Sequence, residues 1–137
     1  MEVQELVSVA VSGSSVPTTL DGPMGPGGNV GIGDFAIRPD SSRVVYTAGG
    51  ELFSAPIDGS LEPTKLNGQL GPNGNVSPYL VISPDGSRAV DRADPDTLGD
   101  QELFSVPING SSVPTKRNGT TGRRGNGGHR ECEIRPA

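Results

Sequence analysis

The segment whose residue types most clearly suggest a chemical role is acidic: DRADPDTLGDQE, at residues 91–102. Calcium prefers hard oxygen ligands, and carboxylates provide them. The candidate ligands are Asp94, Asp96 and Asp100. The spacing differs from that of an EF-hand loop, because Gly99 is misplaced and Pro95 stiffens the start of the segment. Calcium binding therefore stands beside a simpler interpretation, in which the segment is a solvated acidic loop.

Nucleophilic catalysis is the second chemistry to consider, and it is limited by the one histidine of the chain, His129. A Ser-His-Asp triad needs that histidine beside an activated serine, and the sequence contains no G-x-S-x-G elbow. Cys132 lies three residues after His129, a spacing that places the two side chains on opposite faces of a strand. We therefore expect no catalytic residues, no zinc site, no bound cofactor and no enzyme activity.

Positive charge is concentrated near the C-terminus. Residues 113–137 carry six Lys or Arg against two Glu, whereas the first 112 residues carry five against fourteen acidic residues. The basic residues are Lys116, Arg117, Arg123, Arg124, Arg130 and Arg135. No aromatic residue is interleaved with them, so nucleic-acid bases would find nothing to stack on. We expect a solvated segment and no nucleic-acid partner.

The composition indicates a loop-rich chain of one ordinary domain. Gly and Pro together contribute 34 of the 137 residues, and Leu, Ile, Val and Phe contribute 31. A single cysteine excludes an internal disulfide. The first fifteen residues have no basic region and only a short apolar run, so we expect neither a signal peptide nor a membrane span.

The clearest signal is an internal repeat. One phrase occurs three times, as ELVSVAVSGS, ELFSAPIDGS and ELFSVPINGS, starting at residues 5, 51 and 102. A Pro-Thr phrase that ends in Asp-Gly or Asn-Gly follows each copy. The segments FAIRPDSSRVVYTA at 35–48 and LVISPDGSRAVDRA at 80–93 also correspond, and a third copy reaches only CEIRPA at 132–137. A period of this length is typical of solenoids and propellers.

Each segment of the repeat reads as a short strand bounded by turn residues. The sequence SPDG at Ser83–Gly86 is a strong turn signal, because Gly86 tolerates a positive φ. The matching turn at residues 39–42 lacks that glycine, so we expect it to be less well formed. Pro56 and Pro107 fall within the third strand of the repeat, which we expect to be bulged or already ending there.

The sequence therefore predicts an all-β fold of antiparallel four-stranded blades, in the form of an incomplete β-propeller with two complete blades flanked by partial ones. The predicted units are a half blade at 1–22, blades at 33–68 and 79–118, and a degenerate tail with one further strand at 119–137. The glycine-rich segments between the units lack a phosphate-binding motif, and we interpret them as links.

The pattern ISPDGSR, ELFSVPINGS and PTKLNG resembles the PD40 repeat, the WD40-like blade of TolB-type β-propellers. The resemblance extends from Glu5 to Pro136 and is most specific at Ser83–Arg88, whereas RPDSSR at Arg38–Arg43 departs from it. It implies a propeller but no reaction, because such repeats occur in binding proteins, in periplasmic accessory proteins and in propellers attached to peptidases. It also favours a compartment outside the cytoplasm, while the localisation stays open.

Three arrangements stay open for a chain with this number of strands. We favour a segment of a longer propeller; several copies completing a ring by self-association, or an open curved array, are the alternatives. The expected role is a non-catalytic part of a protein-binding or scaffold propeller, whose partner is another protein or the remainder of its own propeller. The alternatives are the propeller portion of a hydrolase or peptidase, and a repeat-built surface protein with calcium-binding loops.

Overall fold

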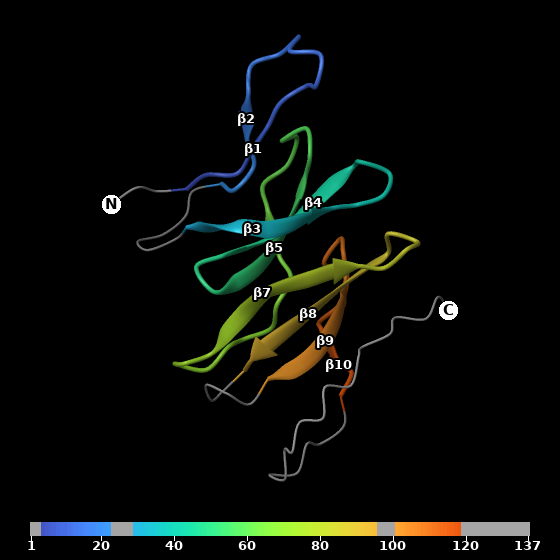
Figure 1. Ribbon diagram of the computed structural model, residues 1–137. Coiled ribbons are helices and arrows are strands. Elements are labelled where there is room, and N and C mark those ends of the chain that lie inside the picture. Colours follow the sequence, from blue (N-terminus) through green and yellow to red (C-terminus); the bar gives the residue numbers. More distant parts are fainter. Residues whose placement is uncertain (1–3, 23–28, 96–100, 119–137) are drawn as a thin grey trace.

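The computed structural model describes residues 4–22, 29–95 and 101–118, and the part of the chain that it describes contains ten strands and no helix (Figure 1). The strands form three antiparallel sheets of two, four and four strands. The prediction of an all-β protein made of antiparallel sheets is therefore confirmed.

Within each sheet the strands are neighbours in the order in which the chain makes them. The first sheet contains β1 (Val7–Ser8) and β2 (Thr18–Thr19). The second contains β3 (Val30–Ile37), β4 (Arg43–Ala48), β5 (Glu51–Pro56) and β6 (Thr64–Lys65). The third contains β7 (Asn75–Ile82), β8 (Arg88–Asp94), β9 (Glu102–Pro107) and β10 (Thr115–Lys116). β3 and β7 begin a few residues before the expected starts at 33 and 79.

The two prolines of the repeated phrase lie at strand ends. Pro56 is the last residue of β5 and pairs with Arg43, and Pro107 ends β9 in the same way. A proline has no N–H for the ladder, so the end of a strand is where it is tolerated. Of the two expectations, a bulge or a strand end, the structure confirms the strand end.

The prediction of a less well formed turn at residues 39–42 is wrong. Ser41 N–H donates to Arg38 O at 2.8 Å, and Gly86 N–H donates to Ser83 O at 2.7 Å in the matching turn, so both turns are closed. Ser41 reaches this geometry with a φ of 61°, close to the 72° of Gly86. The missing glycine therefore costs backbone strain at Ser41 and does not loosen the turn.

Replacing Ser41 with glycine tests this strain. We expect Ser41→Gly to raise the free energy of unfolding by about 0.5–1 kcal/mol, because the strain released exceeds the extra freedom that glycine gives the unfolded chain. The reciprocal change, Gly86→Ser, should lower it by more than about 1 kcal/mol, since a Cβ there would lie 3.0 Å from Arg38 Nε. Urea denaturation measures both; destabilisation by Ser41→Gly would contradict the explanation.

The sheets stack face to face, and the same backbone contact joins each sheet to the next (Figure 1). Val30 N–H donates to Gln4 O at 3.2 Å, and Val76 N–H donates to Gly50 O at 2.8 Å, in equivalent positions of the repeat. The buried residues between the first and second sheets are Leu20, Val30, Val44, Tyr46, Ala48 and Ala55. Those between the second and third are Val45, Leu52, Leu66, Val76, Ala89, Ala93, Val106 and Ile108.

Glycines in the turns that follow β5 and β9 allow this close stacking. A Cβ on Gly59 would lie 2.4 Å from Thr18 Cγ2, and a Cβ on Gly110 would lie 2.7 Å from Thr64 Cγ2. Each threonine belongs to the last strand of the preceding sheet. The second part of the repeated phrase therefore contacts the neighbouring sheet as well as turning the chain.

Substitution of these glycines separates stacking from backbone strain. Gly13 adopts a φ of 70° in the equivalent turn, yet a Cβ there would meet no atom within 4 Å. We expect Gly13→Ala to cost about 1 kcal/mol from strain alone, and Gly110→Ala to cost about 1–2 kcal/mol more, because it also drives a methyl group into Thr64. Chemical denaturation of both variants measures the difference; equal costs would show that the sheets do not stack this closely.

Candidate functional site

The two junctions between sheets differ at one central position, which holds Tyr46 in β4 and Asp91 in β8. Tyr46 is completely buried. Its ring stacks on Phe53 with centroids 5.7 Å apart, and its hydroxyl donates to Leu20 O at 3.4 Å. Burial raises the pKa of this hydroxyl, and the nearby Asp21 and Glu62 carboxylates add to the shift. In the first junction, therefore, a tyrosine fills the space beside the preceding sheet.

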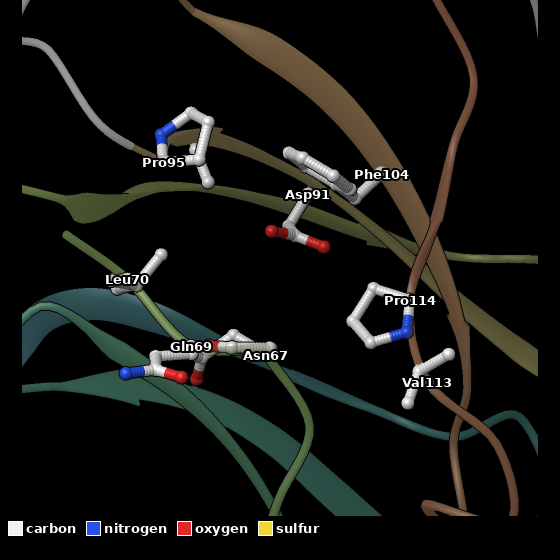
Figure 2. A pocket seen from close by; sticks show the side chains of 10 residues that line it. Asn67, Gln69, Leu70, Asp91, Pro95, Phe104, Val113 and Pro114 are labelled. Carbon is white, nitrogen blue, oxygen red and sulfur yellow. Dashed lines mark hydrogen bonds between the residues drawn. The ribbon is translucent and has the colours of Figure 1, made fainter.

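In the second junction an aspartate stands at the position of Tyr46, and a cavity lies where the tyrosine ring would be. Asp91 pairs with Phe104 as Tyr46 pairs with Phe53, and it is only 3% exposed. A cavity of about 190 Å³ lies beside it, and Asp91 is the one charged residue among those that line it. Figure 2 shows the carboxylate projecting into this space. The apolar walls come from Leu70, Ala93, Pro95, Phe104, Val113 and Pro114.

The link between β6 and β7 is held against the end of β8, and this contact forms one wall of the cavity. Gly71 N–H donates to Pro95 O at 2.7 Å. Gly74 lies so close to the same carbonyl that a Cβ there would be 2.8 Å away. At the start of the link, Asn67 Oδ1 accepts a hydrogen bond from Leu52 N–H at 2.8 Å. The link that forms this wall is therefore held by a side-chain hydrogen bond at its start and by backbone contacts with Pro95 further along.

The electrostatics of Asp91 are those of a carboxylate without a counter-ion. Desolvation raises its pKa from 3.8 to about 6, and a hydrogen bond from its own backbone N–H opposes the shift. Among the described residues no cation forms an ion pair with it. The neighbouring Arg92 is exposed and its guanidinium lies 5.0 Å from the centre of the Tyr79 ring. Because successive side chains of a strand alternate, Arg92 lies on the opposite face of β8.

A second cavity, of about 380 Å³, lies between the turns of the second and third sheets and is lined by three arginines. Arg43 and Arg88 are repeat equivalents, and each donates through Nε to a serine of the adjacent strand at 2.9 Å. Arg38 donates through Nε to Gly86 O at 2.8 Å. Each guanidinium thus already serves the sheet or the junction between sheets, so we interpret this cavity as structural.

The predicted calcium ligands fall mostly outside the described residues. Asp96 and Asp100 lie there, whereas Asp94 is the last residue of β8, buried and paired with Asn75. Within residues 4–22, 29–95 and 101–118, no group of three or more His, Cys, Asp or Glu could hold a metal ion. Calcium binding stays a prediction.

The basic and catalytic candidates are likewise only partly described. Lys116 pairs with Glu102, and Arg117 Nε donates to Ser105 Oγ at 3.1 Å. The others, Arg123, Arg124, His129, Arg130, Cys132 and Arg135, lie outside the described residues. The sequence analysis missed Asp91, although the signal was present: an aspartate stands where the preceding copy has a tyrosine.

In comparisons with known proteins, no family model, no curated protein and no solved structure matches the chain. In the part of the chain that the structure describes, no helix is long and apolar enough to cross a membrane.

The raised pKa of Asp91 predicts a specific pH dependence of stability. The folded protein holds this proton more tightly than the unfolded chain, so the stabilisation is complete below about pH 4 and is lost as the pH rises through about 6. We therefore expect the stability of Asp91→Asn relative to wild type to rise by about 2–3 kcal/mol between pH 4 and pH 7.

Urea denaturation at several pH values measures this difference. Asp58→Asn is a matched control, because it removes one carboxylate from an exposed turn and introduces the residue found at the equivalent position, Asn109. The stability of the control relative to wild type should show no such rise between pH 4 and pH 7. A constant difference between Asp91→Asn and wild type across this pH range would contradict the assignment.

Proposed function

We propose that the chain is a non-catalytic segment of a β-propeller that binds or scaffolds protein. The observation that supports this proposal is the repetition of the junction: two successive pairs of sheets use the same backbone hydrogen bond, at Val30 and at Val76. A repeated contact between antiparallel sheets of sequential strands is how propellers and other repeat proteins extend.

Exposed apolar side chains on the second and third sheets favour further sheets or a protein partner. Phe35 and Ile37 are exposed, and they pair with Tyr46 and Val44, which face the two-stranded first sheet. At the other end, Val81 is exposed and pairs with Val90 on the face of the third sheet turned away from the second. Exposed apolar side chains on such incompletely covered sheet faces are typical of surfaces that further strands, another sheet or a partner covers.

The coding sequence on both sides of this reading frame provides the first test of the proposal. In-frame copies of the SPDGSR and ELFSVPI phrases beyond the chain would support it, and function would then belong to the whole propeller. Flanking sequence without such copies, together with a strictly monomeric protein in solution, would overturn it.

Within the described residues no further sheet covers the far face of the third sheet, and this face should also mediate association of the isolated chain. We expect sedimentation equilibrium to give a molar mass that increases with concentration, and Val81→Lys to reduce this increase strongly by placing a charge on the face. Val81 is exposed, so the substitution should change stability by less than about 0.5 kcal/mol.

Val11→Lys is the control for this experiment, because Val11 is fully exposed in the turn region that follows β1. It adds the same charge and should leave association unchanged. Equal association of both variants and wild type would show that the face of the third sheet is not a contact surface.

A further inference from the structure

The Asp91 cavity has the size of a small ligand. Its volume of about 190 Å³ exceeds that of an engineered apolar cavity of about 150 Å³ that binds benzene. Gln69 and Val113 on its lining are exposed, so the rim reaches solvent. A molecule with an apolar body the size of one aromatic ring can therefore enter from this rim.

The one charged group of the cavity, the Asp91 carboxylate, can be compensated by a positively charged ligand. The Asp91 carboxylate is almost fully buried and projects into the space between Leu70 and Phe104 (Figure 2). A buried carboxylate is costly unless a cation or hydrogen-bond donors compensate it. No ion pair to Asp91 exists within the described residues, so the compensating charge can come from a ligand.

The walls favour an organic cation over a metal ion. The side chains around the carboxylate are mainly apolar, and Asp91 is the single carboxylate of the lining, whereas calcium takes six to eight oxygen ligands. The Phe104 ring lies on the same wall and its face attracts ammonium and guanidinium groups. The set of one acid, one aromatic ring and aliphatic walls fits a monocation with an apolar body.

The fold itself does not require an acid here. The equivalent position in the preceding sheet is Tyr46, which is fully buried and donates a hydrogen bond to Leu20 O. The aspartate therefore replaces a stabilising residue by one that leaves a hole and an uncompensated charge. Such a departure from a repeat pattern is typical of a functional position.

We propose that this cavity binds a small organic monocation, an ammonium or guanidinium group on an apolar body of about benzene size, with Asp91 as its counter-ion. The cavity lies between the link that follows β6 and the third sheet, and the residues that line it belong to the described part of the chain, so the proposal does not depend on whether further sheets follow.

Titration of the full 137-residue chain with benzylammonium chloride at pH 8, where Asp91 is ionised, tests the proposal. Calorimetry and ¹H–¹⁵N correlation spectra should show saturable binding, with the largest shifts at the amides of Leu70, Ala93 and Phe104. Benzyl alcohol, a neutral molecule of the same shape, should bind at least tenfold more weakly. Absence of saturable binding, or equal binding of the alcohol, would overturn the proposal.

Variants separate the charge from the cavity. Asp91→Asn should weaken benzylammonium binding at least tenfold, whereas Asp58→Asn, which removes an exposed carboxylate, should leave it unchanged. Asp91→Tyr should abolish binding by filling the space as Tyr46 does, while dispersed spectra show that the chain is folded. Undiminished binding to either Asp91 variant would refute the assigned site.

The same titration distinguishes two sources of the cation. N-acetyl-lysinamide stands for a lysine side chain of a partner protein, and benzylammonium stands for a free amine. Tighter binding of the first would identify the natural ligand as a protein side chain, and tighter binding of the second would identify a small molecule. Failure of both would exclude the class of ligand.

Discussion

Burial of each sheet against the next is the constraint on which the rest of this structure depends. The strands are short, and in the part of the chain that the structure describes each sheet is buried mainly against its neighbour, so a single sheet buries too little apolar surface to be stable alone. Val45, Leu66 and Val106 belong to one cluster of buried residues between the second and third sheets. Each such aliphatic side chain contributes about 1.5–3 kcal/mol when fully buried. Stability is therefore a property of the junctions, and a change at a junction affects two sheets at once.

This constraint explains why the chain repeats one phrase. The phrase supplies a strand, a proline at the strand end, and a turn glycine that must lie against a threonine of the preceding sheet. Two constraints therefore require glycine at positions 59 and 110: each residue has a positive φ, and each lies against a threonine side chain of the preceding sheet. The ion pairs Lys65–Glu51 and Lys116–Glu102 repeat as well. Surface ion pairs of this kind contribute little to the stability of the fold, because water screens the charges. Repetition of the phrase reflects how sheets stack, and by itself it points to no chemistry.

Asp91 is the place where stability and binding oppose each other. A tyrosine at this position would extend the core, as Tyr46 does in the first junction, whereas the aspartate leaves a cavity and a carboxylate with a raised pKa. The loss of stability is limited, since Leu70 and Phe104 are held by contacts that do not involve the carboxylate. The fold can thus tolerate the substitution, and the proposed cation would restore the missing packing and charge together.

The repeat and its Pro-Asp and Asn-Gly signals predicted the strands, their order and the places of the turns, because turn signals act over a few neighbouring residues. The sequence left undecided whether Pro56 ends or bulges its strand, and it predicted a loose turn at Ser41, since local propensity does not report strain that the rest of a sheet enforces. The Asp91 cavity could not be predicted from composition or spacing, because its walls come from four separate segments of the chain. Only the tertiary structure decided that this aspartate is buried, since which face of a strand is covered depends on the sheet that packs against it.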